Sequence, residues 1–413
     1  MSKESPHPGL SFGGFVATVA VIQVIIAMAI DMMVPALGHI AQSLHLGGGN
    51  ERQWVISSFV ISLGVGQLGF GVIADRFGRK TPLVLCLGLY ALGSFGASVA
   101  PGLVPLLLAR VVQGLGAAGA EVMILAIIRD CYAGRLMAKV NSLSFMVFLA
   151  APIIAPWLGQ QMLRIAPWQA IFIMLGAYAS LALLWVLWRL PETMHKQDRR
   201  PIALQSYRLA AREVLTTRVS VGYMVATGLV WGGWLGFIYS AQQIFADVFH
   251  ALALFPAVFA LCSVSMAIAA LTNARLVERF GMRRLAHGAL LVLVLTSGLQ
   301  MVLAFSPYES LWHFAILQML VMLSFGFLAG NLSAISMEPL GHIAGTGASI
   351  QGFVSTFGAS CLGSLIGLGF DGTLRPFTGG AFLCVLASLA VVLVAEYGRL
   401  FRAYPPPAGA ETL

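Results

Sequence analysis

The chain has 413 residues, of which 59% are hydrophobic and only 10% are charged, and its formal net charge is +8. Soluble domains carry about 25% charged residues, and no soluble core could bury this much apolar surface. The composition therefore excludes an ordinary soluble protein and predicts that the lipid bilayer is the solvent for most side chains.

Cysteine spacing and charge placement point away from metal and nucleic-acid chemistry. The five cysteines lack CxxC spacing and mostly fall inside apolar runs, so we interpret them as small buried hydrophobic residues. The positive charge of a membrane protein sets its orientation, and is therefore no sign of nucleic-acid binding. Because no nucleophile, metal or phosphate-loop pattern stands out, we expect no enzyme activity and no metal.

Stretches of about 20 apolar residues occur twelve times, the first at 12–38 and the last at 377–400. One long polar stretch, residues 191–218, interrupts them. It divides the chain into a predicted N-terminal six-helix bundle at 1–190 and a C-terminal six-helix bundle at 219–413, joined by a cytoplasmic central loop. The predicted fold class is an all-α polytopic membrane protein with 12 transmembrane helices in two bundles.

Positive charges are distributed unevenly between the loops. With a cytoplasmic N-terminus, 20 of the 24 Lys and Arg residues fall in cytoplasmic segments. Arg52, Arg164 and Arg375 fall outside, and Arg110 lies within a span. Since cytoplasmic loops carry the excess of Lys and Arg, we predict that both termini and the central loop face the cytoplasm.

Asp31 and Arg110 interrupt otherwise apolar spans of the first half. A charge at mid-bilayer costs roughly 2.5–3.5 kcal/mol on insertion scales, faces the protein interior and usually marks an ion or substrate path. Desolvation favours the protonated carboxyl group, whereas a nearby cation favours the ionised one. Asp31 could therefore take a proton from outside and release it inside in competition with a cargo. The alternative is a static Asp31–Arg110 pair that joins spans one and four.

Glu121 and Gln23 are the next polar candidates. Glu121 lies close to three helical turns past Arg110, near the cytoplasmic end, and either receives the transported proton or balances nearby basic groups. Gln23 lies two turns below Asp31 and can form hydrogen bonds without carrying a charge. Arg110 is present, and the outer and central parts of the first-half spans hold no acid other than Asp31. This favours a neutral, zwitterionic or weakly acidic amphiphile over a doubly charged cation.

The second half contributes the aromatic segment WGGWLGFIY, Trp231 to Tyr239. Trp231 and Trp234 are three residues apart and share a helical face, which suits either a cavity wall or ordinary packing. Met32, Phe145 and Phe148 could form the facing wall, although methionine is also an ordinary core residue. The predicted proton-coupling residues are Asp31, Arg110 and Glu121. The predicted substrate-binding residues are Gln23, Asp31, Met32, Arg110, Phe145, Phe148, Trp231, Trp234 and Tyr239.

Several motifs resemble those of a known transporter family. GVIADRFGRKTPL, Gly71 to Leu83, resembles the loop signature of the major facilitator superfamily, and Asn273 to Arg284 resembles a degraded copy of it in the second half. LLLARVVQGLGAAGA, Leu106 to Ala120, resembles a motif of drug:proton antiporters. IDMMVPAL, beginning at Ile30, and Met337 to Phe353 resemble the Bcr/CflA branch of that family.

The segment APIIAPWLG stands in the place of the span-five antiporter motif. It departs from that motif at Ala155, where a glycine is usual, and at Gln160. The resemblance implies that span five seals the outer half of the protein against span eight. We expect its two prolines to bend the helix, because each removes a helical hydrogen bond. The residues concerned are Pro152, Pro156 and Gly159.

The resemblance also implies the major facilitator fold, with a central cavity and two bundles that rock about it as a monomer. In such proteins the first loop signature and the end of span four form a cytoplasmic latch. We expect this latch to hold the outward-open form and to break when the bundles rock. Its residues here would be Gly71, Asp75, Arg76, Gly78, Arg79 and Asp130.

The motifs together predict a proton-coupled antiporter of the bacterial cytoplasmic membrane that exports a small amphiphile such as an antibiotic. It would need no cofactor, because the proton gradient drives it. An exporter of an endogenous metabolite or a siderophore-like metallophore stays open as an alternative. A proton symporter that imports a nutrient fits the motifs of spans four and five less well.

Overall fold

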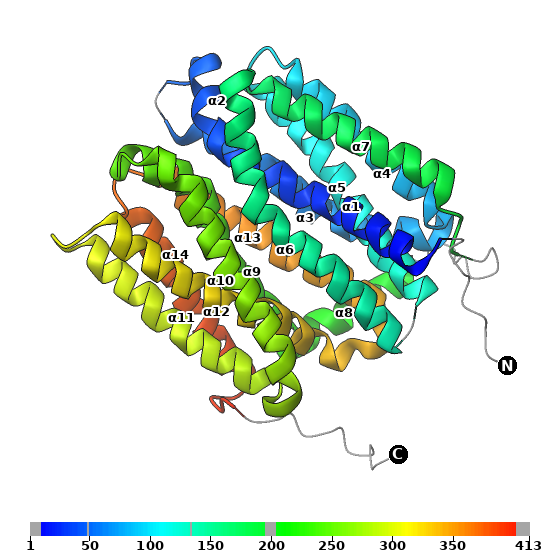
Figure 1. Cartoon of the computed structure of the whole chain (residues 1–413). Coiled ribbons are helices and arrows are strands. Elements are labelled where there is room, and N and C mark those ends of the chain that lie inside the picture. Colours follow the sequence, from blue (N-terminus) through cyan, green and yellow to red (C-terminus); the bar gives the residue numbers. More distant parts are fainter. Residues whose placement is uncertain (1–9, 48, 133, 195–203, 402–413) are drawn as a thin grey trace.

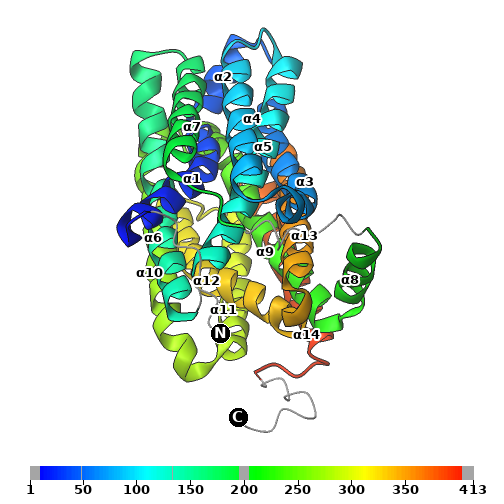
Figure 2. The same cartoon turned by 90° about the vertical axis from the view of Figure 1, so that its right-hand side faces the viewer.

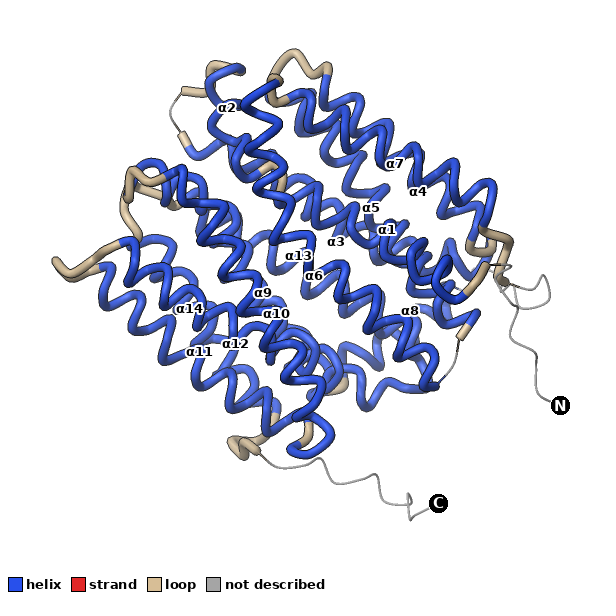
Figure 3. The backbone as a smooth tube through the Cα atoms, viewed as in Figure 1, coloured by secondary structure: helices blue, strands red, loops and turns tan. Residues whose placement is uncertain are grey.

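The computed structural model describes residues 10–47, 49–132, 134–194 and 204–401, and these residues form helices and loops without a strand (Figures 1 and 3). Apolar runs of this length form helices in a bilayer because a helix satisfies every backbone hydrogen bond internally. The helices of the first half are α1 (Phe12–Asp31), α2 (Leu37–Ser43), α3 (Trp54–Phe77), α4 (Lys80–Ser98), α5 (Leu103–Cys131), α6 (Gly134–Ile165) and α7 (Gln169–Arg189).

The second half repeats this layout after a short connecting helix. The connecting helix is α8 (Leu204–Thr216). The helices that follow it are α9 (Arg218–Gln243), α10 (Phe255–Phe280), α11 (Met282–Ala304), α12 (Leu311–Met337), α13 (Ala344–Leu368) and α14 (Arg375–Ala395). Short 3-10 or π segments, η1 (Val34–Ala36), η2 (Asn50–Gln53), η4 (Ile244–Val248), η5 (Leu252–Leu254) and η6 (Glu338–Ile343), lie between them.

Ten helical runs of the described residues are long and apolar enough to cross a membrane. One of them, Leu311–Leu368, contains both α12 and α13. The helix α6 is a further span of 32 residues, and some of its side chains lie outside the described part. The prediction of 12 transmembrane helices is therefore confirmed. Leucines such as Leu92, Leu181 and Leu295 are more than 65% exposed, as expected for side chains that face lipid.

The two six-helix bundles lie side by side, as Figure 1 shows. Across their boundary α3 packs along α13, and α6 packs along α10. Small residues allow the close approach of α3 and α13: a Cβ atom on Gly64 would lie 2.6 Å from the backbone nitrogen of Phe357. A Cβ atom on Gly71 would lie 2.7 Å from the hydroxyl oxygen of Ser349.

We call the two ends of the bundles the basic end and the opposite end. The basic end carries the α3–α4 and α10–α11 loops, centred on Gly78 and Gly281, together with α8. These two glycines have φ angles of 89° and 79°, in the left-handed region that favours glycine. They occupy equivalent places in the two halves, so the sequence repeat is also a structural repeat. The opposite end carries the loops around Gly49 and Gly102.

The first span is broken where the sequence reads DMMVP. Asp31 is the last residue of α1, and η1 and α2 continue the span. Pro35 has no N–H group and therefore cannot donate the helical hydrogen bond that the carbonyl oxygen of Asp31 would accept. The chain tightens instead, with Met33 N–H donating to Ile30 O at 3.1 Å. The only acid of this span is thus placed at a helix break.

The central stretch, expected only as a polar loop, contains the helix α8. Its sequence LQSYRLAAREVLT is rich in good helix formers. Val214 is fully buried in a small cluster with Met224, Leu340 and Ile350, which fixes α8 against the second bundle. Figure 2 shows α8 to one side of α13 at the basic end.

Candidate functional site

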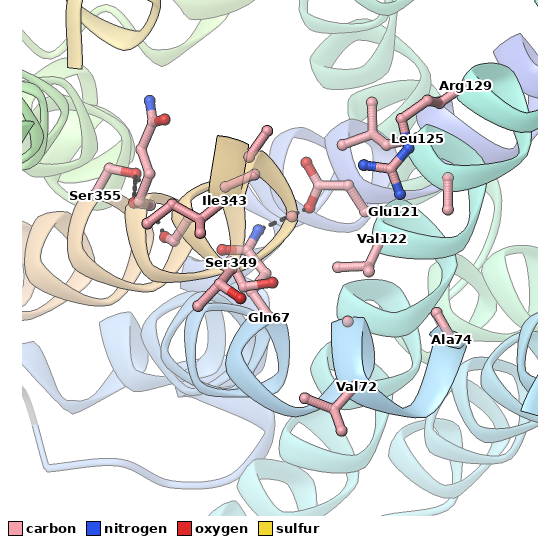
Figure 4. A pocket seen from close by; sticks show the side chains of 18 of the residues that line it. Gln67, Val72, Ala74, Glu121, Val122, Leu125, Arg129, Ile343, Ser349 and Ser355 are labelled. Carbon is pink, nitrogen blue, oxygen red and sulfur yellow. Dashed lines mark hydrogen bonds between the residues drawn. The ribbon is translucent and has the colours of Figure 1, made fainter. Parts of the chain in front are cut away.

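A cavity of about 740 Å³ lies between the two bundles. The first bundle lines it with α3 and α5, and the second bundle with α9, α12, η6 and α13. Asp75, Arg129 and Tyr207 lie at its mouth, and Asp75 and Arg129 are exposed, so the cavity opens at the basic end. Figure 4 shows part of its wall.

Glu121 is the charged side chain that projects deepest into this cavity from α5. It lies ten residues before Cys131, the end of α5, or roughly 15 Å of helix from the basic end. Gln67 of α3 is 8% exposed, and its Nε2 donates a hydrogen bond to Glu121 Oε2 at 2.9 Å. Figure 4 shows both side chains turned toward each other. Glu121 therefore lies on the cavity wall and makes no ion pair with a basic group among the described residues, while its role as acceptor of the transported proton stays a prediction.

The opposite end is closed by amide side chains that join the bundles. Asn50 Nδ2 donates to the carbonyl oxygens of Leu368 and Phe370, each at 2.8 Å. Gln53 Nε2 donates to Gln243 Oε1 at 2.5 Å, and Gln243 Nε2 donates to Asn50 Oδ1 at 2.7 Å. We call Asn50, Gln53 and Gln243 the amide gate. It closes the opposite end while the basic end stays open, so this is an inward-facing form if the basic end is cytoplasmic.

Arg110 is fully buried but does not pair with Asp31. Its guanidinium donates to Val55 O at 2.7 Å, to Ala29 O at 3.1 Å and to Gln113 Oε1 at 2.5 Å. It also lies over the Phe59 ring, 4.4 Å from its centroid. No ion pair within the described residues joins Arg110 to Asp31. The alternative of a static Asp31–Arg110 pair is therefore wrong for this structure.

Asp31 is 2% exposed, and its Oδ1 has no hydrogen-bond partner among the described residues. Neither Asp31 nor Arg110 lines the cavity at the basic end. Met32 is also fully buried, and a Cβ atom on Gly159 would lie 2.6 Å from its carbonyl oxygen. Asp31 and Met32 are thus packed inside the first bundle, against α6, in this conformation.

The predicted aromatic segment divides between the cavity and the core. Trp231 lines the cavity and makes an edge contact with Trp234, with ring centroids 5.2 Å apart. Trp234 stacks on Phe325 of α12. Phe237 is in the core of the second bundle, and Tyr239 is buried with its hydroxyl 3.0 Å from Ser360 Oγ. Both interpretations of this segment therefore hold, each for different residues.

Three predicted substrate-binding residues are placed less fully. Phe145 and Phe148 are on α6, but their side chains lie outside those that the structure describes. Gln23 is on α1 and half-buried, and its Oε1 has no partner within the described part of the chain. Gln23 does not line the cavity.

The predicted latch is assembled around Arg79. Its guanidinium binds Asp130 at 2.8 Å and Asp75 at 3.0 Å, while its backbone N–H donates to Glu192 at 2.8 Å. Burial lowers the pKa of Arg79, but the hydrogen bonds and charges of Asp130 and Asp75 outweigh this effect and raise it. Arg79 therefore stays charged.

Every partner of Arg79 among the described residues belongs to the first bundle, and these ion pairs are formed in this structure with the basic end open. That these ion pairs break when the bundles rock stays a prediction. Of the other latch residues, Gly71 and Asp75 line the cavity, Gly78 forms the turn, and Arg76 lies over Phe77.

The second bundle repeats this ion cluster, which sequence reasoning missed. Arg283, two residues after Gly281, binds Glu338 at 2.7 Å and Glu396 at 2.8 Å. Glu338 directly follows α12 and Asp130 is next to last in α5, which are equivalent helices of the two halves. The signal was present as acids at the ends of spans ten and twelve. From the sequence alone these two acids look like any other acidic residues near loops, because only the structural equivalence of the two halves relates them to the acids around Arg79.

In span five, α6 runs unbroken through Pro152 and Pro156. It packs against α10, the eighth span, as the resemblance implied. Gly159 faces span one rather than α10, and its lack of a side chain lets α6 approach the helix break there. A Cβ atom on Gly159 would lie 3.1 Å from the Pro35 ring. The predicted bend at the prolines stays a prediction.

Comparison with known proteins agrees with this architecture. The family profile described as Major Facilitator Superfamily matches residues 19–364. The chain belongs to the major facilitator superfamily. Members of this family are membrane transporters rather than enzymes, and the multi-pass fold of this chain agrees.

Curated relatives cover almost the whole chain. The bicyclomycin resistance protein homolog of Haemophilus influenzae is 28% identical over 91% of this chain and 94% of its own length. Multidrug resistance protein D of Escherichia coli is 26% identical over 89% of this chain and 90% of its own length. An uncharacterized transporter of the same family from Bacillus subtilis, YdgK, is 27% identical over 87% and 90%. These names are consistent with the Bcr/CflA branch.

Solved structures of the family share the fold. The partially occluded, inward-open xylose transporter XylE from E. coli superposes with a TM-score of 0.75. It is 11% identical and covers 97% of this chain and 99% of its own. A D-xylose-proton symporter has a TM-score of 0.72 at 14% identity, covering 94% of this chain and 98% of its own. At these identities the likeness establishes the major facilitator fold alone.

Proposed function

We propose that this transporter is a proton-coupled antiporter that exports a small amphiphilic compound, such as a drug or antibiotic. The single observation that carries the proposal is the cavity between the bundles, open at the basic end and closed at the opposite end by the amide gate. Such a cavity is one of the two states that alternating access requires. The names of the multidrug and bicyclomycin resistance relatives support efflux as the direction.

The basic end is the cytoplasmic end in this proposal. Arg79, Lys80, Arg129 and Arg283 gather there, and cytoplasmic loops carry the excess of such residues. A cavity that opens there collects its cargo from the cytoplasm and releases it outside. The protein would work as a monomer in the bacterial cytoplasmic membrane, without a cofactor.

Asp31 is the proposed proton carrier. An ionised carboxylate is costly to bury unless it is paired, and Asp31 Oδ1 has no partner among the described residues. Arg110 forms no ion pair with Asp31 among the described residues, and its hydrogen bonds go to Val55 O, Ala29 O and Gln113 Oε1 instead. A proton that enters from the outside when the amide gate opens would neutralise Asp31 during the return step. One proton crossing about 100 mV supplies roughly 2.3 kcal/mol for this cycle.

The test is compound-driven proton movement in proteoliposomes. Phenicols, bicyclomycin-like compounds, quinolones and lipophilic cations are added in turn to wild type and Asp31→Asn at equal protein content. We expect at least one compound to dissipate the pH gradient in wild type, and Asp31→Asn to bind it without moving protons. If Asp31→Asn still exchanges protons, Asp31 is not the carrier, and Glu121→Gln is tested next.

A further inference from the structure

The charges on the cavity wall of α5 are of opposite sign and two helical turns apart. Glu121 and Arg129 both line the cavity, with Val122, Leu125 and Ala126 between them. Eight residues of helix place their Cα atoms about 12 Å apart along the axis. Figure 4 shows both side chains projecting from α5 toward the same space. Within the described residues they form no ion pair with each other.

Among the described residues, the protein occupies only part of the hydrogen-bonding capacity of the Glu121 carboxylate. Gln67 Nε2 binds one of its two carboxylate oxygens at 2.9 Å, and Gln67 is itself 8% exposed. A carboxylate can accept several hydrogen bonds, so it retains capacity for a donor inside the cavity. Because an amide is neutral, Gln67 orients the carboxylate without cancelling its charge.

Arg129 differs from the other charged residues at the mouth. Arg79 is shared between Asp75 and Asp130, which are thereby paired. Arg129 is exposed, and among the described residues no carboxylate lies within ion-pair distance of it. A guanidinium at such a place suits a carboxylate, which it can bind through two parallel hydrogen bonds.

The facing wall from the second bundle is polar but largely uncharged. It presents Trp231 and the hydroxyl or amide groups of Thr227, Ser333, Gln351 and Ser355. The titratable group of this wall among the described residues is His342, which binds Glu213 of α8 at 2.8 Å near the mouth. Among the described residues that line the cavity, the charged side chains without an ion pair, Glu121 and Arg129, are both on α5. This helix would therefore bind the charged groups of a ligand, while Trp231 offers an aromatic surface to its body.

We propose that Glu121 and Arg129 select a zwitterionic amphiphile, with its protonated amine at Glu121 and its carboxylate at Arg129. Gln67 positions Glu121, and the aromatic part of the compound lies against Trp231. This inference rests on the proposed function, since it names the class of cargo that the same cavity takes. It orients the cargo with its amine toward the interior.

Equilibrium binding to the purified full-length protein tests this without any transport step. The probes are ciprofloxacin, which is a zwitterion, its N-acetyl derivative, which lacks the basic amine, and its methyl ester, which lacks the carboxylate. We expect wild type to bind the zwitterion about tenfold more tightly than either derivative, because each derivative can form only one of the two charged interactions.

The variants assign each charge to its residue. Glu121→Gln should weaken the zwitterion and the ester about tenfold and leave the N-acetyl derivative unchanged, and Glu121→Asp should restore part of the affinity. Arg129→Gln should weaken the zwitterion and the N-acetyl derivative and leave the ester unchanged. Glu278→Gln and Arg212→Gln, which remove exposed charges outside the cavity lining, serve as matched controls.

Equal affinity of wild type for the three probes, absence of binding, or Glu121→Gln weakening all three alike would overturn the inference. These outcomes are independent of Asp31. Proton antiport with any other compound, abolished in Asp31→Asn, would still support the proposed function. If wild type binds the zwitterion more tightly than its two derivatives but no compound moves protons, the inference is supported and the proposed proton coupling is contradicted.

Discussion

Arg110 donates a hydrogen bond from Nη2 to the carbonyl oxygen of Ala29, 3.1 Å away and two residues before Asp31. The same guanidinium reaches Val55 O on α3 and Gln113 on its own helix. The buried cation therefore holds the end of α1 through backbone dipoles. Arg110 thus fixes the position of Asp31 through the backbone of α1, without an ion pair to the Asp31 carboxylate among the described residues.

Replacing Arg110 with lysine separates the effect of charge from that of geometry. A lysine keeps the charge but cannot present the planar set of donors, so Arg110→Lys leaves buried acceptors unsatisfied. We expect the free energy of unfolding to fall by about 2 kcal/mol or more, measured by reversible unfolding in mixed detergent micelles. Arg164→Lys is the control, because among the described residues Arg164 donates only to Gln161, at the exposed end of α6. Equal stability of Arg110→Lys and wild type would show that only the charge matters.

Asp31→Asn should keep or raise the unfolding temperature. Its Oδ1 has no partner among the described residues, so removing the charge removes a burial cost and breaks no hydrogen bond shown by the structure. Thermal unfolding of the purified variant measures this. A clear drop in stability would instead mean that Asp31 serves the fold, and loss of transport in the variant would then have a structural cause.

The amide gate should control which end of the cavity is open. Asn50→Ala removes two hydrogen bonds to α13 and its C-terminal loop and one from Gln243, so the closed opposite end becomes less stable. Ser57→Cys, introduced below the gate at a position 1% exposed, reports opening by its labelling rate with an impermeant thiol reagent. We expect a rate increase of about tenfold, since roughly 1.4 kcal/mol of gate stability suffices.

A control for that measurement is Glu51→Ala, a neighbouring exposed residue without a gate contact among the described hydrogen bonds. Native cysteines are replaced beforehand so that Ser57→Cys is the labelled site. An unchanged labelling rate in Asn50→Ala would show that helix packing alone keeps the opposite end closed.

Gly159 should tolerate no side chain. A Cβ atom there would lie 2.6 Å from Met32 O, at the break that carries Asp31, so Gly159→Ala must displace α6 or span one. We expect it to cost about 1–3 kcal/mol of stability and to reduce transport. Gly358→Ala is the matched control, because nothing lies within 4 Å of its added Cβ atom. Greater helix propensity should make that variant equal to or slightly more stable than wild type.

The membrane spans and their division into two groups of six could be predicted from the sequence, because the requirement that the bilayer places on each span concerns only the residues of that span. Each apolar run of about 20 residues must satisfy its own backbone hydrogen bonds, so its helix is determined by its own residues. The loop signature at Gly71–Leu83 and its second copy likewise pointed to the family and to Arg79 with Asp75 and Asp130. These residues lie close to helix ends whose positions the spans already define.

Tertiary structure alone decided which polar groups meet inside the bundles. Asp31 and Arg110 both lie within predicted spans of the first half, yet the arrangement of α1 and α5 directs the guanidinium to Ala29 O and Val55 O instead. Gln67 lies beside Glu121 because α3 and α5 approach closely: a Cβ atom on Gly66 would lie 2.6 Å from Ala118 Cβ, and one on Gly114 would clash with Phe59 O. Helix rotation and close approach depend on contacts between residues dozens to hundreds of positions apart, and the residues of a single helix do not determine which of these contacts form.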